Sequence, residues 1–550
     1  MKPPLLRHDA DALRRHAGEP WYLHRPLAAR IAQLARERPD GLAFRSERSS
    51  MTWHEYDERS DALAVVFAEL GLHPGDRVGV VLPDGPEVHA VYVAAEKIGL
   101  VVMGIGPRAG EREVRHLLQR AACRALVSGP AIGDVPAHEV LSDLRQRGAQ
   151  IEHHLVLDDD CIADPEGTLR RVVVDGQRIV LDRGDRAAEV VADRGLRPDD
   201  LFLLNSTSGT TGLPKCVMQH QNRWAYFHHV AAQAGALSGD DVVMSLVSAP
   251  FGFGLWTSHF TPALLGVPCI VMARFSPTGA LEMIASESVT MLACVSTQFV
   301  MMLNSPAVDD VDLSSLRVMF TGGEAVPRDR AEGFERRTGA AVLQFFGSNE
   351  TGALSRTALT DTAEQRWTTA GKVIDEMQVR LLAEDGSDVT ASGGPGQPAC
   401  RGPATCLGYY DDEAANEQLF TQDGWMLTGD IATIDDDGYL RVVGRTSDLI
   451  IRGGKNISAV EVESEVGTHP SVAMVAAVAK PDSTFGERVC VFVVPRAGTT
   501  VTLEEIAEHL RSRGVSKDLV PEHLVLVYEL PQASGGKVAK ARLRELLGSS

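Results

Sequence analysis

The sequence predicts an α/β fold with largely parallel sheets, in which a large N-terminal region is followed by a small C-terminal α/β domain. Short apolar runs bounded by turn residues are typical of buried strands, and they occur at residues 78–82, 125–127, 201–204, 269–272 and 316–320. Amphipathic helical patterns at 60–70 and 111–122 lie between them, which is the alternation of an α/β architecture. The chain of 550 residues is also too long for one core of ordinary size, so two or more domains are expected.

The pattern changes from residue 379 onward. Shorter segments punctuated by Gly and Asp predict a β-containing subdomain. The sequence DDDGY at residues 435–439 predicts a hairpin turn between strands at 431–434 and 440–443. We therefore expect the N-terminal domain to span residues 1–444.

The remaining residues, 445–550, are predicted to form a compact α/β domain of their own. Thr502 and Glu505 have the spacing of a capping box, and the helix that follows would place Ile506 and Leu510 on one face. Residues 158–200 show the opposite character: they carry many charges and few periodic apolar positions. We expect a peripheral excursion there and assign it no function.

Composition and charge indicate a soluble, cytoplasmic enzyme. Hydrophobic residues make up 44% and charged residues 23% of the chain, close to the average for globular proteins. The formal net charge of -20 argues against broad binding of nucleic acids or anionic membranes, because the long-range field repels polyanions. Neither a signal peptide nor a membrane-spanning run is expected.

The eight cysteines are scattered, without a CxxC pair or a nearby histidine at metal-ligand spacing. Reduced and mostly buried thiols are the expected state. These residues are Cys123, Cys161, Cys216, Cys269, Cys294, Cys400, Cys406 and Cys490.

The most informative stretch is residues 201–215, LFLLNSTSGTTGLPK, where a buried-strand pattern runs into a loop of Ser, Thr and Gly that is closed by Lys215. Gly209 and Gly212 let backbone N–H groups turn inward, and Lys215 adds a cation. Hydroxyl donors come from Ser206, Thr207, Ser208, Thr210 and Thr211. Such a loop suits the β- and γ-phosphates of ATP. Its spacing differs from that of P-loop NTPases, and a flexible linker would not normally follow a buried strand directly.

The segment STSGTTGLPK resembles the signature loop of the adenylate-forming superfamily, which includes acyl-CoA synthetases, aryl-acid ligases, luciferases and peptide-synthetase adenylation domains. Further motifs agree in order: GDRV at 75–78, FGSNE at 346–350 like YGxTE, GWMLTGD at 424–430 like GWxxTGD, Gly444-Arg445 with Asp448 like GRxxD, and PQASGGK at 531–537 like PxxxxGK. The resemblance covers nearly the whole chain. It implies a large N-terminal domain of α/β subdomains plus a β-containing subdomain, and a small mobile C-terminal domain.

The resemblance implies roles for residues around the nucleotide. Glu350 would be a magnesium ligand, since a hard cation that bridges phosphates needs carboxylate oxygen. Asp430 and Arg445 would contact the ribose hydroxyls. The base and the α-phosphate would be met by Gly322, Gly323, Glu324, Phe346, Gly347 and Asn349. Asn349 departs from the usual Thr of the motif, which puts its contact with the α-phosphate or the carboxylate in doubt.

Lys537 is the predicted catalytic lysine of the C-terminal domain. Attack of a carboxylate on the α-phosphate brings two anions together, and a positioned ammonium stabilises the transition state. The resemblance implies that this domain then rotates and presents Gly453, Gly454 and Lys455 for the second half-reaction, where glycines permit close approach to pantetheine. Ser447 stands where relatives usually have Asp or Lys at the hinge, so the control of the rotation is open.

The acid pocket is expected in the aromatic segment after the phosphate loop. By analogy it would include Tyr226, Phe227, Pro250, Phe251, Gly252, Phe253, Gly254 and Trp256. Their mostly apolar character favours an apolar or aromatic carboxylate of small to medium size. Phe253 stands where many relatives have His, and no nearby Asp would pair with an α-ammonium, which disfavours amino acids.

The expected reaction uses ATP and Mg²⁺ to form an acyl-AMP from this acid, releases pyrophosphate, and then transfers the acyl group to coenzyme A. Three alternatives stay open: a carrier-protein thiol or an amine as acceptor, activation of nitrite for diazotisation of an arylamine, and a nucleotide-binding protein without catalysis. A homodimer is also left open.

Overall fold

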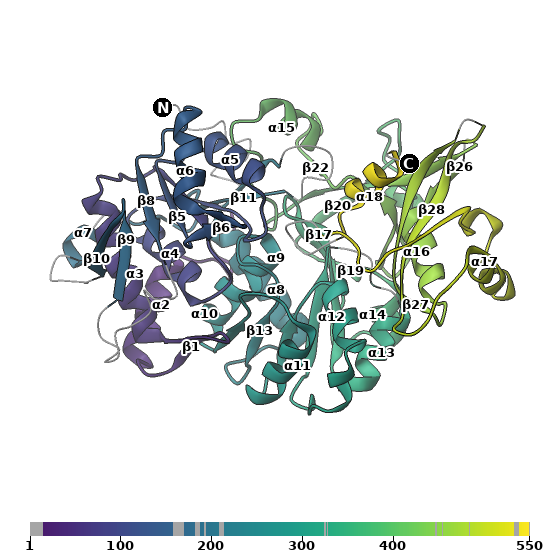
Figure 1. Cartoon of the computed structure of the whole chain (residues 1–550), viewed down its shortest axis with the longest axis horizontal. Helices are drawn as coiled ribbons and strands as arrows, with labels where there is room; N and C mark the ends of the chain where they lie inside the picture. The colour runs from purple at the N-terminus through teal and green to yellow at the C-terminus, as the bar shows by residue number, and fades with distance from the viewer. Residues whose placement is uncertain are drawn as a thin grey trace.

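The computed structural model describes residues 15–157, 170–181, 187–191, 194–207, 214–323, 326, 328–445, 448–453, 455–482, 484–532 and 538–548 (Figure 1). It is a mixed α/β structure with two large sheets, smaller antiparallel sheets and a separate C-terminal sheet. In Figure 1 the purple and blue segments lie at the left, the teal segments in the lower middle, and the yellow-green C-terminal unit at the right. The expected fold class, including the smaller C-terminal domain, is confirmed.

The first large sheet has eight strands in the order β10-β9-β8-β5-β3-β4-β11-β12. The pairings from β8 to β11 are parallel, and antiparallel strands extend both edges. Its strands are β3 (Arg77–Val81), β4 (Val101–Gly104), β5 (Ala125–Ser128), β8 (His153–Val156), β9 (Arg170–Val174), β10 (Gln177–Leu181), β11 (Leu203–Ser206) and β12 (Cys216–Gln219). The helices here are α2 (Leu27–Glu37), α3 (Trp53–Glu69), α4 (Pro86–Lys97), α5 (Glu111–Arg120), α6 (Ala137–Gln146) and α7 (Ala187–Val191), with a small hairpin of β6 (Ala131–Ile132) and β7 (Val135–Pro136).

The second large sheet has nine strands in the order β19-β18-β17-β16-β15-β13-β14-β1-β2. The strands from β17 to β1 run parallel. They are β1 (Leu42–Arg45), β2 (Ser50–Thr52), β13 (Val243–Ser245), β14 (Cys269–Val271), β15 (Met291–Ala293), β16 (Val318–Gly322), β17 (Ala341–Ser348), β18 (Gly352–Arg356) and β19 (Lys372–Val373). The helical segments are α8 (Gln221–Gly235), α9 (Gly252–Gly254), η2 (Leu255–Phe260), α10 (Thr261–Leu265), α11 (Pro277–Ser286), α12 (Ser296–Leu303), η3 (Pro306–Asp309), α13 (Arg328–Thr338) and α14 (Ala363–Thr368).

The five buried strands expected from apolar runs are confirmed as β3, β5, β11, β14 and β16, and the two helices lie in α3 and α5. The expectation for residues 158–200 was wrong in one respect. Residues in this range form β9 and β10, which pair antiparallel with each other; β9 also pairs antiparallel with β8, so β10 is the edge strand of the first sheet. Charged residues mask these two strands in the sequence, although Val172 of β9 is fully buried.

The β-containing subdomain and the C-terminal unit complete the chain. The former holds β20 (Gln378–Leu382), η4 (Thr390–Ser392), β21 (Gln397–Arg401), α15 (Glu413–Leu419), β22 (Met426–Leu427), β23 (Asp430–Ile434) and β24 (Leu440–Arg445), the last two forming the predicted hairpin. The C-terminal unit holds β25 (Leu449–Arg452), β26 (Lys455–Ser458), α16 (Ala459–Gly467), β27 (Val472–Asp482), β28 (Gly486–Pro495), α17 (Leu503–Ser512), η5 (Lys517–Leu519), β29 (His523–Leu526) and α18 (Lys540–Gly548). Thr502 caps α17 in the predicted capping box.

The C-terminal unit contacts the rest of the protein through polar bonds at separate places. Arg330 donates to the carbonyl of Val472 at 3.2 Å, and Arg496 donates to the Oδ1 atom of Asn304 at 2.9 Å. A third bond, from Arg108 to Gln532, lies beside the candidate site and is described below. Met474 of the C-terminal unit also packs against a hydrophobic cluster of the second large sheet.

All seven cysteines in the described part of the chain are free and buried, as expected, and Cys161 lies outside it. Among the helices that the structure describes, none is both long and apolar enough to cross a bilayer.

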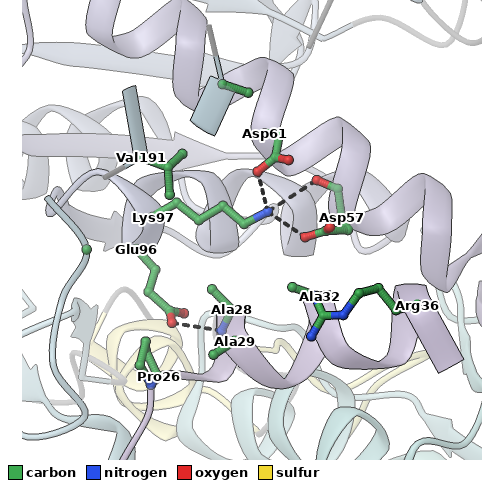
Figure 2. A pocket seen from close by; sticks show the side chains of 12 residues that line it. Pro26, Ala28, Ala29, Ala32, Arg36, Asp57, Asp61, Glu96, Lys97 and Val191 are labelled. Atoms are coloured by element: carbon green, nitrogen blue, oxygen red, sulfur yellow. Dashed lines mark hydrogen bonds and ion pairs between the residues drawn. The ribbon is translucent and has the colours of Figure 1, made fainter. Parts of the chain in front are cut away.

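A cavity of about 390 Å³ lies between α2, α3 and α4, with α7 at its side (Figure 2). Lys97 in its wall is buried, and its ammonium donates to Asp57 Oδ1 at 2.7 Å, Asp61 Oδ1 at 2.7 Å and Ser60 Oγ at 2.8 Å. These bonds use all three donor protons of the lysine. Glu96 is also buried and accepts a hydrogen bond of 2.8 Å from the backbone N–H of Ala28 at the start of α2.

Glu96→Gln is expected to raise stability at pH 8 relative to the native chain and to change it little at pH 5. Burial raises the pKa of Glu96 to about 7. Because the folded carboxyl holds a proton that the unfolded one has lost, stability falls as the pH rises from about 4.5 to 7, by roughly 3 kcal/mol in total. A glutamine still accepts the bond from Ala28. Thermal midpoints at both pH values measure the difference, with the exposed Glu37→Gln as control; an identical pH profile for Glu96→Gln and the native chain would contradict the assignment.

Candidate active site

The loop predicted to bind phosphate connects two paired strands at the edge of the first sheet. β11 and β12 pair antiparallel, and β11 runs parallel to β4, so the carboxyl ends of β4 and β11 meet at one edge. Thr207 and Lys215 close the stem: the N–H of Thr207 donates to the Lys215 carbonyl at 3.0 Å, and the N–H of Lys215 donates to Thr207 Oγ1 at 3.1 Å. The Oγ atom of Ser206 is buried and has no partner among the described residues, which leaves a hydroxyl for a ligand.

The tip of the loop lies outside the residues that the structure describes. Ser208, Gly209, Thr210, Thr211 and Gly212 are therefore predicted phosphate contacts whose positions are not given.

Tyr409 brings Lys215 and Glu350 together. Residues 407–410 pair with β12, because Met218 donates to the carbonyl of Gly408 at 2.9 Å and Tyr410 donates to that of Cys216 at 2.8 Å. This pairing places the Tyr409 ring 4.8 Å from the Nζ atom of Lys215. The Tyr409 hydroxyl donates to Glu350 Oε1 at 2.8 Å. The predicted lysine and the predicted metal ligand thus share one neighbour.

The Tyr409 hydroxyl keeps its proton, because burial and the Glu350 carboxylate raise its pKa. Sequence reasoning did not select this residue. The only local signal is a Gly-Tyr-Tyr run, and aromatic pairs of this kind are common in cores.

Glu350 sits on a short turn that fixes its backbone. Ser348 Oγ accepts from the N–H groups of Glu350 and Thr351, both at 3.1 Å, and the Glu350 carbonyl accepts from the N–H of Cys406 at 2.8 Å. One carboxylate oxygen accepts from Tyr409, and the other makes no hydrogen bond to the described part of the chain. A single carboxylate presented in this way fits Mg²⁺, which is usually held by one or two carboxylates together with substrate phosphates.

Asn349 is held in a buried amide network. It exchanges two hydrogen bonds with Asn205, of 3.0 and 2.8 Å, and the Nε2 atom of Gln219 donates to Asn205 Oδ1 at 2.9 Å. Asn205 and Gln219 are fully buried. The residue that departs from the family motif is therefore tied to β11 and β12, the strands that carry the phosphate loop.

The strands predicted to face the base end side by side. β16 and β17 are parallel with Gly322 opposite Phe345, so Gly323 and Phe346 follow at the same edge. Gly347 admits no side chain, because a Cβ atom would lie 1.7 Å from the carbonyl oxygen of Gly352. Glu324 lies outside the described residues.

The predicted ribose contacts form an ion pair across the β23–β24 hairpin. Arg445 Nε donates to Asp430 Oδ1 at 2.8 Å, and Asp430 is buried while Arg445 is half-exposed. Burial lowers the pKa of Arg445, but the Asp430, Asp448 and Glu350 carboxylates outweigh it and the pKa is raised. The guanidinium is thus within electrostatic reach of Glu350.

The aromatic segment is divided between exposed and buried positions. Phe251, Gly252 and Phe253 are partly exposed, whereas Trp256 has no exposed surface and stacks behind Phe253 with ring centroids 5.5 Å apart. Phe227 lies 4.7 Å from the Trp256 ring. Phe251 and Phe253 are therefore the predicted pocket side chains with exposed surface, and Phe227 and Trp256 pack behind them.

Two further residues predicted for the acid pocket, Tyr226 and Gly254, contact neighbouring parts of the protein. Tyr226 points away from Phe227, because its hydroxyl donates to Glu376 at 3.1 Å and its ring packs against Trp21. Gly254 faces the backbone, and a Cβ atom there would lie 2.1 Å from the carbonyl oxygen of Ser248. Neighbouring residues on a helix point in directions about 100° apart, so Tyr226 and Phe227 contact different parts of the protein, and the pocket role of Tyr226 stays a prediction.

Lys537 lies outside the described residues, but the base of its loop does not. Gln532 and Val538 form an antiparallel bridge on either side of it, and Gln532 Oε1 accepts from Arg108 at 2.7 Å. Arg108 follows β4, whose carboxyl end lies beside that of β11. The loop base is therefore held at the edge of the large domain where the phosphate loop begins.

The segment predicted to serve the second half-reaction lies elsewhere in this arrangement. Gly453 and Lys455 belong to the β25–β26 hairpin, and Lys455 pairs with Asp518 at 2.8 Å. In Figure 1 β26 lies at the outer side of the C-terminal unit, away from β11. Gly454 and Ser447 lie outside the described residues.

Comparisons with known proteins agree with this architecture. The family model described as AMP-binding enzyme matches residues 31–410, and that of the AMP-binding enzyme C-terminal domain matches residues 461–537. A 2-hydroxy-7-methoxy-5-methyl-1-naphthoate–CoA ligase of Streptomyces carzinostaticus is 31% identical over 98% of this chain and 96% of its own. A salicylyl-CoA synthase / salicylate adenylyltransferase of a Streptomyces species is 30% identical, with the same shares of 98% and 96%. The structure of the anthranilate CoA ligase AuaEII with anthranoyl-AMP has a TM-score of 0.82 at 21% identity, covering 96% of this chain and 98% of that one, which is a likeness of fold.

Proposed function

The chain belongs to the AMP-binding enzyme family, and from this premise we propose that it is an AMP-forming acid–thiol ligase. It would form an acyl-AMP from ATP and an apolar or aromatic carboxylic acid, release pyrophosphate, and transfer the acyl group to coenzyme A. The observation that carries the proposal is the contact of Tyr409 with both Lys215 and Glu350. It joins a cation at the end of the phosphate loop to a carboxylate suited to a metal ion.

In the first half-reaction, different residues of this site would bind different parts of the nucleotide. The loop of residues 206–215 binds the β- and γ-phosphates through its N–H groups, its hydroxyls and Lys215. Asp430 and Arg445 orient the ribose, and Phe346 covers the base. Glu350 would hold Mg²⁺, which supplies charge neutralisation at the phosphates when bound.

Lys537 would complete the site from the C-terminal domain. Its ammonium lowers the repulsion between the attacking carboxylate and the α-phosphate and stabilises the charge that develops between them. The bond between Arg108 and Gln532 supports this role, because it anchors the base of the Lys537 loop beside β4. The domain boundary at residues 444 and 445, with the hinge near Ser447, belongs to the same proposal.

Arg108→Ala is expected to slow adenylate formation roughly fivefold, the equivalent of about 1 kcal/mol, which is the usual net worth of one hydrogen bond; this bond is solvent-exposed. Consumption of a supplied acyl-adenylate should stay unchanged, because the bond exists only in the arrangement with Gln532 at this edge. Single-turnover rates of both half-reactions measure the effect, and Arg112→Ala on the exposed face of α5 is the control. Equal slowing of both half-reactions by Arg108→Ala would contradict the anchoring role.

The acid is proposed to be apolar or aromatic because the partly exposed side chains of Phe251 and Phe253 carry no charge, and Phe227 and Trp256 pack behind them. The two Streptomyces relatives described above are named for aromatic acids, which supports the same class. Coenzyme A is the proposed acceptor because the names of both relatives also include CoA.

Pyrophosphate release with a panel of acids tests the proposal. Benzoate, salicylate, a medium-chain fatty acid and nitrite would each be supplied with ATP and Mg²⁺, followed by mass analysis with coenzyme A or an arylamine present. Acid-dependent pyrophosphate release and an acyl-CoA mass are expected. An amide product would show that an amine is the acceptor in place of coenzyme A, and a diazonium product would show that nitrite is the activated acid. Binding of ATP without pyrophosphate release for any acid would indicate a nucleotide-binding protein without catalysis.

A further inference from the structure

Arg223, in the first turn of α8, is a buried cation beside the Glu350 turn and the end of β12. Its side chain is fully buried, and the guanidinium lies 4.7 Å from the Trp224 ring. It donates to the side-chain carbonyl of Gln219, to the backbone carbonyl of Ala404, and to that of Glu350 at 3.3 Å. All three acceptors are neutral, and within the described ranges no carboxylate forms an ion pair with Arg223.

These bonds fix the orientation of the amide network. Because Gln219 accepts from Arg223 with its oxygen, its Nε2 atom must point the other way, and it donates to Asn205 Oδ1 at 2.9 Å. Asn205 in turn exchanges two bonds with Asn349. One guanidinium therefore reaches Asn349 through two amides and Glu350 through its carbonyl.

The same guanidinium forms no ion pair among the described residues, although the Glu350 carboxylate lies within electrostatic reach and partly offsets the effect of burial on its pKa. Burial lowers the pKa of Arg223 to about 10, so the group stays charged at neutral pH. A buried charge is costly unless an opposite charge or a full set of hydrogen bonds compensates it. β12 leads from the phosphate loop to Gln219, and the Glu350 carboxylate acts on the guanidinium without pairing with it, so a bound polyphosphate would be a second anion in the field of this charge.

We propose that Arg223 is a positioning residue that orients the Asn349 and Glu350 turns and supplies a fixed positive potential for the polyphosphate of a nucleoside triphosphate. The inference rests on the proposed function, because it assumes that the phosphate loop holds ATP. It assigns Arg223 no contact with the substrate. Its effect on the nucleotide passes through the amide network and through the field of the charge, which acts over longer distances in a buried setting than in water.

Gln219→Glu tests the charge without removing the arginine. A carboxylate at this position would pair with Arg223 and cancel its field, and the paired amides of Asn205 and Asn349 can turn over together to keep their bonds. Gln219→Leu is the matched control, since it removes the hydrogen bonds of Gln219 but adds no charge. Binding of ATP and of adenosine, measured by titration calorimetry in EDTA, separates the phosphates from the base and the ribose.

We expect Gln219→Glu to lower the ratio of ATP affinity to adenosine affinity about tenfold, and Gln219→Leu to lower it less than threefold. Thermal midpoints should be no lower for Gln219→Glu than for Gln219→Leu. Equal ratios in the two variants, or equal losses for ATP and adenosine, would overturn the role of the charge. A native chain that binds no ATP would instead overturn the proposed function together with this inference.

Arg223→Lys separates the charge from the geometry. Lysine keeps the cation but has no planar fork to hold Gln219 and Glu350 at once. The ratio of ATP to adenosine affinity should therefore stay near that of the native chain, while kcat for pyrophosphate release falls at an unchanged KM for ATP. A rise of KM with kcat intact would contradict the positioning part of the proposal.

Discussion

Lys537→Ala is expected to lower the rate of adenylate formation about 100-fold or more while leaving consumption of a supplied acyl-adenylate largely intact. The reason is that the ammonium acts on charge that develops only during attack on the α-phosphate, and removal of such a group costs about 3 kcal/mol of transition-state stabilisation. In the proposed mechanism the second half-reaction would use another arrangement of the C-terminal domain, in which this side chain is not needed.

Single-turnover assays of each half-reaction measure the difference. Lys517→Ala is a suitable control, because Lys517 is an exposed lysine of the same domain in η5. If Lys537→Ala slowed both half-reactions alike, or if Lys517→Ala had the same effect, the catalytic role of Lys537 would be refuted.

Glu350→Gln is expected to reduce adenylate formation by a similar factor, about 100-fold, and to raise the Mg²⁺ concentration needed for half-maximal rate. The glutamine keeps an oxygen that can accept the bond from Tyr409, so the turn should keep its shape. What is lost is the charge, and an uncharged amide is a much weaker ligand for a hard cation.

Mg²⁺ titrations at saturating ATP reveal the effect, and unfolding curves check that the fold is kept. Glu417→Gln, at an exposed position of α15, is the matched control. A variant at Glu350 with native Mg²⁺ dependence and a lower rate would mean that the carboxylate serves the reaction in another way.

The sequence was informative wherever a residue's own neighbours decide its structure. Buried strands such as β3 and β16 are short apolar runs, and the α17 cap needs only Thr502 and Glu505. The strands β9 and β10 were missed because both carry charged residues; β10 is the edge strand of the sheet, where exposed positions can carry charge and remove the apolar signal.

Residues of the site that belong to local motifs could be predicted from the sequence, but the long-range contacts between them could not. Lys215 and Glu350 each follow from a local motif, but Tyr409 depends on the pairing of residues 407–410 with β12, a long-range contact. Arg223 has no motif at all, since a helical arginine is usually exposed and its burial follows from the packing of α8 against residues far away in sequence. The contact of Tyr226 with Glu376 is likewise long-range and could not be predicted from the resemblance.

Because residues 407–410 pair with β12, an insertion or deletion in this segment should disturb the site more than a substitution. Tyr409 and Tyr410 pack into different hydrophobic clusters on opposite faces of the extra strand. An insertion or deletion of one residue after Cys406 would exchange these faces and turn a hydrocarbon-packed ring toward Lys215 and Glu350. Chimeras with related enzymes should therefore take the stretch from Ala404 to Tyr410 together with its partner strand, as one cassette.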